Sequence, residues 1–65
     1  GVVCNVERNG NVEEIPYVLN GGTAVLIYNR TGEKITVGTQ EDINIGDVVF
    51  VRQRRNSVRE FIIVR

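Results

Sequence analysis

The chain has 65 residues, no net charge at pH 7, a single cysteine and no histidine. This length allows one small domain, one cysteine excludes an internal disulfide, and the ligand set is too small for a zinc site. No apolar run approaches the ~18 residues of a membrane-spanning helix, so we expect no membrane insertion by this segment. The chain starts at Gly1 without a Met, and we expect residues 1–65 to be a single domain cut from a longer protein.

The first two predicted strands form a hairpin. Residues 2–8 alternate between apolar and polar side chains, as a half-buried strand does. Asn9-Gly10 follows, and this dipeptide is the strongest short-range signal for a tight β-hairpin turn. Residues 11–19 supply the second arm, where Pro16 cannot donate a ladder hydrogen bond and therefore predicts an edge strand or a bulge.

The middle of the chain predicts a second pair of strands. Asn20-Gly21-Gly22 is a turn, and residues 23–29 after it are apolar on both faces. A loop with Gly32 in a left-handed position leads into residues 33–38, which alternate cleanly. Residues 39–42 are polar and predict a loop or one short turn of 3₁₀ helix.

The last third predicts a turn, a buried strand and a closing strand. Gly46 and Asp47 suit a tight turn, because Gly accepts positive φ and Asp bonds to nearby backbone N–H groups. Residues 48–51 are four apolar residues in a row, which favours a strand covered on both faces. Residues 58–64 close the chain after a turn at residues 54–57.

Together these elements predict an all-β domain: a small six-stranded antiparallel barrel, OB- or SH3-like, with no helix longer than about one turn. In a chain this short, a strand can be covered on both faces only if the sheet closes or nearly closes. The residues expected in the core are Val25, Ile27, Ile35, Val37, Phe50 and Ile63.

The sequence offers no constellation for catalysis. Cys4 has no neighbouring base and is best interpreted as a small buried apolar residue. Glu13 and Glu14 would point to opposite faces of a strand, so they cannot work as a facing acid–base pair. No segment has the spacing of a phosphate-binding loop or a nucleophile elbow. We therefore expect a protein that is not an enzyme, with no catalytic, cofactor-binding or metal-binding residues.

The uneven placement of charge marks one candidate interaction patch. Residues 1–51 carry three positive and seven negative charges, whereas residues 52–65 carry five arginines against Glu60 alone. Arginine suits phosphate and carboxylate partners, but charge on a hydrophobic hairpin also provides solubility and protects a sheet edge. The patch consists of Arg52, Arg54, Arg55 and Arg59.

One resemblance covers residues 17–65. It rests on Asn20-Gly21-Gly22, on Thr-Ala-Val-Leu-Ile-Tyr at 23–28, on Asp-Ile-Asn-Ile-Gly-Asp-Val-Val-Phe-Val at 42–51, and on Val-Arg-Glu-Phe-Ile-Ile-Val-Arg at 58–65. This pattern resembles the small all-β domains of bacterial cell-surface proteins, often found in chains that carry S-layer homology modules. The resemblance implies a non-catalytic module with a spacer, interaction or assembly role, located at the cell surface or outside the cell. Its partners would be neighbouring domains of the same chain or another surface protein.

A second resemblance is to the OB fold of bacterial initiation-factor type. It rests on an early Gly-x-Val strand, the Ile-x-x-Gly-Asp-x-Val-x-Val pattern and an Arg-rich C-terminal strand. That family usually has a short helix between its third and fourth strands, whereas residues 35–42 leave room for at most one turn. This resemblance implies the alternative function, a cytoplasmic nucleic-acid-binding module that uses the Arg hairpin.

Overall fold

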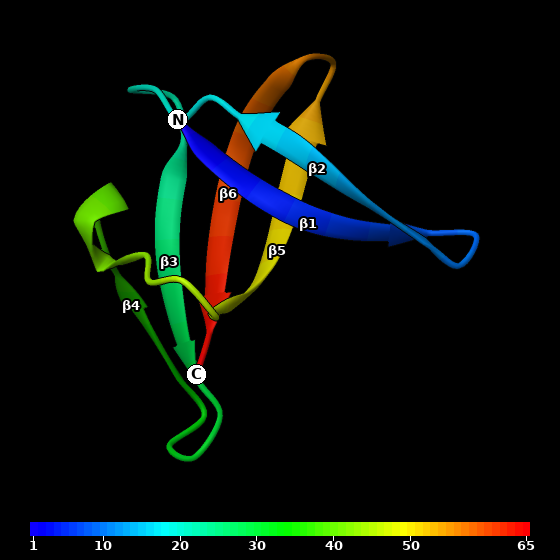
Figure 1. The fold of residues 1–65 in the computed structure, drawn as a ribbon. Helices are drawn as coiled ribbons and strands as arrows, with labels where there is room; N and C mark the ends of the chain where they lie inside the picture. Colours follow the sequence, from blue (N-terminus) through cyan, green and yellow to red (C-terminus); the bar gives the residue numbers. More distant parts are fainter.

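The computed structural model describes all 65 residues and contains six strands and one short turn of 3₁₀ helix, η1 (Figure 1). This confirms the prediction of an all-β chain with no helix longer than one turn. The elements are β1 (Val2–Arg8), β2 (Asn11–Tyr17), β3 (Ala24–Asn29), β4 (Lys34–Val37), η1 (Gln40–Asp42), β5 (Val48–Arg54) and β6 (Ser57–Val64).

The strands form two sheets. One is the β1–β2 hairpin, and the other has four strands in the order β4-β3-β6-β5. In Figure 1 the hairpin crosses in front of β6 and β5, and its tip extends beyond the edge of the four-stranded sheet. Neither sheet is closed into a barrel. The predicted barrel is therefore not confirmed.

The prediction that all strands are antiparallel was wrong at the centre of the larger sheet. There β3 and β6 run parallel, from the pair Ala24–Glu60 to the pair Tyr28–Val64. The segment between β4 and β5 carries the chain from one edge of the sheet to the other, so β6 enters the middle beside β3. Turn sequences predict where the chain reverses between consecutive strands. They do not predict which strands that are far apart in the sequence, such as β3 and β6, will pair.

The first hairpin turn follows its local sequence, but the prediction of a left-handed Gly32 was wrong, because Glu33 takes the positive φ in that loop, at 50°. Asn9 and Gly10 adopt φ angles of 51° and 81°, as the tightest hairpin turn requires, and β1 and β2 pair from Arg8–Asn11 to Val2–Tyr17. Pro16 lies in β2, whose only neighbour is β1. The prediction of an edge strand at Pro16 is therefore confirmed.

The core lies between the hairpin and one face of the four-stranded sheet, which we call the inner face. Phe61 and Ile63 of β6 are completely buried, together with Val25 of β3 and Val58 of β6. Eight partly buried residues pack around these four: Val2, Cys4, Tyr17, Leu19, Ile27, Ile43, Val49 and Val51. Burial of Val25 and Ile63 was predicted correctly, and Ile27 is half-buried at the margin.

Three of the residues expected in the core are exposed instead. Ile35, Val37 and Phe50 keep 62%, 86% and 63% of their surface accessible. They pair across the sheet with Tyr28, Leu26 and Ile62, and these pairs alternate with the inner-face positions along each strand. The apolar run 48–51 predicts cover on both faces, but this chain has only one hairpin with which to cover a face.

The turn before β5 is tied to the end of the chain. The Asn44 backbone N–H donates to Asp47 Oδ2 at 2.8 Å, and Arg65 Nη2 donates to the same oxygen at 3.2 Å. The Asn44 hydrogen bond, followed by the contact with Arg65, holds the pKa of Asp47 below its ordinary value of 3.8. Gly46, between these partners, has a φ of 96°, so the sequence prediction of a special backbone position there is confirmed.

Candidate functional site

The arginines of the candidate interaction patch surround the β5–β6 hairpin but do not share one direction. Arg52 and Glu60 are cross-strand neighbours in the β5–β6 ladder. Their side chains form an ion pair between Arg52 Nε and Glu60 Oε1. The guanidinium of Arg59 lies against the turn before β3, where a Cβ built on Gly22 would meet its Nη1 at 3.6 Å. Two members of the patch are therefore directed toward different neighbours.

Three members of the patch, Arg54, Arg55 and Arg59, make no ion pair in the structure. Arg54 is at the end of β5, and Arg55 occupies the turn with a φ of 57°. Both are exposed. If the hairpin binds an anionic partner, the guanidinium groups of Arg54 and Arg55, like that of Arg59, require no ion pair to be broken first.

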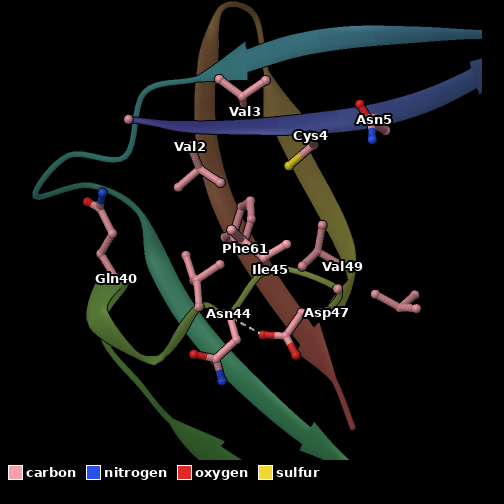
Figure 2. A pocket seen from close by; sticks show the side chains of 14 residues that line it. Val2, Val3, Cys4, Asn5, Gln40, Asn44, Ile45, Asp47, Val49 and Phe61 are labelled. Atoms are coloured by element: carbon pink, nitrogen blue, oxygen red, sulfur yellow. Dashed lines mark hydrogen bonds between the residues drawn. The ribbon is translucent and has the colours of Figure 1, made fainter.

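A groove of about 700 Å³ runs between β1 and the segment that leads into β5. Figure 2 shows Val2 and Cys4 pointing from β1 into it, toward Phe61 and Val49, while Val3 points to the opposite side of β1. Eight of its fourteen lining residues are hydrophobic, so it suits apolar contact.

The groove does not assemble reactive groups. Burial raises the pKa of the Cys4 thiol above its ordinary value of 9.0, which disfavours the reactive thiolate at neutral pH. Asp47 already accepts two hydrogen bonds, one from the Asn44 backbone N–H within the turn and one from Arg65 at the end of the chain. The structure holds no group of three His, Cys, Asp or Glu residues that could bind a metal ion, and no helix is long and apolar enough to cross a membrane.

The largest apolar feature is the face of the four-stranded sheet that the hairpin does not cover. We call it the outer face, and the strand register arranges it as two rows that each cross all four strands. The first row is Val37, Leu26, Ile62 and Phe50; the second is Ile35, Tyr28, Val64 and Val48.

None of these eight side chains is buried, and none is charged. The four on the edge strands β4 and β5 are each more than 60% exposed, and the four on the central strands β3 and β6 are half-buried by their neighbours. The next position along the sheet is the row of Ala24, Glu60 and Arg52, where the ion pair ends the apolar area. The outer face is therefore a continuous apolar surface that ends on one side at an ion pair.

The residues of the outer face are recognisable in the sequence, but their exposure is not. Residues 23–29 and 48–51 are apolar on both faces, and this pattern predicts burial within a closed barrel. The same pattern describes a sheet that is covered on one face and apolar on the other. Alternation alone does not distinguish the two cases.

Comparisons of the chain with protein-family models, with curated proteins and with solved structures found no match. A proposed function therefore depends on three features of the structure: the outer face, the Arg hairpin and the groove.

Proposed function

We propose that this chain is a non-catalytic β module of a larger bacterial cell-surface or secreted protein, and that it serves assembly by docking its outer face onto a partner. The observation that carries the proposal is the arrangement of eight uncharged apolar side chains in two continuous rows, none of them buried. Large contiguous apolar patches on soluble domains mark interaction sites. The partner would be a neighbouring domain or another surface protein.

The sequences of the central strands support a covered outer face in the assembled protein. Strands that are buried on both faces are near-continuous apolar runs, and β3 and the last four residues of β6 are such runs at the centre of this sheet. The inner face has the β1–β2 hairpin as its cover. Leu26, Tyr28, Ile62 and Val64 lie directly behind that core on the opposite face, where the chain provides no cover.

Fractionation of cells that produce the protein tests both parts of the proposal. We expect the protein in the surface or secreted fraction, and we expect Phe50→Lys to release it from its assembly because Lys would place a charge in the docking surface. Val12→Lys is the matched control, since Val12 is 67% exposed but lies on the hairpin. A purely cytoplasmic location would contradict the cell-surface assignment, and unchanged retention of Phe50→Lys would contradict the role of the outer face.

One observation favours nucleic-acid binding as a second candidate function. Phe50 is 63% exposed and lies two positions before Arg52 on β5, so the two side chains share a face. An exposed aromatic ring beside basic residues is the arrangement on which single-stranded nucleic acids stack their bases. The acidic balance of residues 1–51 and the ion pair between Arg52 and Glu60 oppose this candidate.

A titration with single-stranded RNA at two salt concentrations separates the two candidates. For an assembly module we expect a Kd no tighter than ~10⁻⁴ M at physiological salt, the level of non-specific binding. For a nucleic-acid-binding module, binding would be micromolar, would weaken steeply with salt, and would be lost in both Phe50→Ala and the Arg54→Ala, Arg55→Ala double variant. That second result would make nucleic-acid binding the better assignment.

A further inference from the structure

We infer that the occupant of the outer face is the outer face of a second copy of this chain, so that two copies form a face-to-face β-sandwich dimer. The inference rests on the proposed function, because it takes the outer face to be a docking surface. It adds the identity of the partner and the geometry of the contact.

The accessible surface of the chain is larger than is usual for a folded monomer of its size. The value is 5094 Å², whereas the usual scaling predicts about 4,200 Å² for a monomeric protein of 7.3 kDa. The excess of roughly 900 Å² is close to the ~800 Å² that each partner contributes to a standard stable interface. Both the protruding β1–β2 hairpin and the uncovered outer face add to the exposed surface, and Ile35, Val37, Val48 and Phe50 of the outer face are each more than 60% exposed.

The shape of the outer face fits another sheet. Two sheets that pack face to face lie ~10 Å apart with their strands crossing at ~30°, and each presents an uninterrupted apolar face. The two apolar rows of the outer face, which cross all four strands, satisfy this requirement. A twofold dimer uses the same patch on both copies, so a single suitable sheet face supplies both halves of the interface.

The charges permit a surface of this kind to pair with itself. Self-pairing brings like residues near like residues, and a charged patch would therefore oppose it, but the two rows hold no charge. At their boundary Arg52 is already paired with Glu60 of the same copy. The chain as a whole has zero net charge, so two copies approach without long-range repulsion.

Sedimentation equilibrium over a range from low micromolar to millimolar chain tests the inference. We expect a monomer–dimer equilibrium for the native chain, and at least ~30-fold weaker dimerisation for Phe50→Lys and for Val37→Glu, because each places an unpaired charge in an apolar interface. Val12→Lys should dimerise like the native chain. Both outer-face positions are exposed in the monomer, so circular dichroism should show that these variants keep the native fold.

Amide hydrogen exchange distinguishes face-to-face pairing from pairing through strand edges. A face-to-face dimer buries side chains and leaves the outward amides of the edge strands β4 and β5 exchanging as in the monomer. Protection of those amides on dimerisation would overturn the inference in favour of strand addition. A chain that stays monomeric throughout, or a dimer weakened equally by Val12→Lys, would also overturn it.

The proposed docking role at the cell surface and the second copy as its partner can be rejected separately. A monomeric chain whose Phe50→Lys variant is still released from the cell surface rejects the second copy as the occupant and keeps the proposed function. A face-to-face dimer of a protein found only in the cytoplasm keeps the self-pairing and rejects the cell-surface role.

Discussion

Replacing Phe61 with Ala is expected to lower the free energy of unfolding by ~3–5 kcal/mol, because it removes a large buried side chain and leaves a cavity. Phe61 has no accessible surface and lies at the centre of the core between the inner face and the hairpin. A domain of this length has a total stability of only about 3–10 kcal/mol. We therefore expect a large fall in the urea midpoint, and a chain that is largely unfolded at room temperature if the native stability is about 5 kcal/mol or less, as measured by circular dichroism and urea denaturation.

Phe50→Ala is the matched control for this experiment. Phe50 lies on β5, which neighbours β6, but it is on the outer face and 63% exposed. At a chain concentration low enough to keep the protein monomeric, its loss should change the unfolding free energy by no more than ~1 kcal/mol. Equal losses from the two phenylalanines would mean that the outer face is as well packed as the inner face, and the assignment of the core would be wrong.

Replacing Gly46 with Val is expected to lower the free energy of unfolding by ~1–3 kcal/mol through backbone strain. The φ of 96° at Gly46 is one that side chains with a Cβ rarely adopt, and a Cβ placed there would meet no atom within 4 Å. The cost is therefore conformational rather than steric. Urea denaturation should show that Gly46→Ala already causes much of the loss, because a single Cβ is enough to disfavour this conformation.

Gly21→Val provides the comparison for Gly46→Val. A Cβ at Gly21 also meets nothing within 4 Å, but its backbone is not in the left-handed region. We expect its denaturation midpoint to stay close to that of the native chain. A midpoint for Gly46→Val that is also unchanged would show that the turn tolerates another conformation and that the contact between Asp47 and Arg65 does not depend on it.

The outer face gives a physical reason for the low burial of this chain. Only four of its 65 residues are buried, which is little for a domain that must offset its conformational entropy with apolar burial. A partner on the outer face would bury eight more apolar side chains, and binding of this kind stabilises the folded state by mass action. Folding stability and assembly are coupled in this proposal, and unfolding midpoints should rise with chain concentration if the partner is a second copy.

The amino-acid sequence by itself determined the local structure. Asn9-Gly10 specified the first hairpin turn because few other residues accept two successive positive φ angles, and Gly46 did the same for the turn before β5. Alternation and β-branched runs placed the six strands, and the polar residues 39–42 limited the helical content to η1. These features depend on neighbours within a few positions, where the physical constraints are steric and local.

Tertiary structure alone decided which face of each strand is covered. Alternation shows that Phe50 shares a face with Val48, and that Val49 shares one with Val51, but it does not show which face the β1–β2 hairpin covers. That choice follows from the crossing from β4 to β5, which places β6 beside β3, and from the position of the hairpin on one side only. For the same reason Ile35, Val37 and Phe50 became a surface instead of a core. Burial depends on contacts between segments far apart in the chain, and a local pattern of apolar residues is the same whether its partner is the chain itself or another molecule.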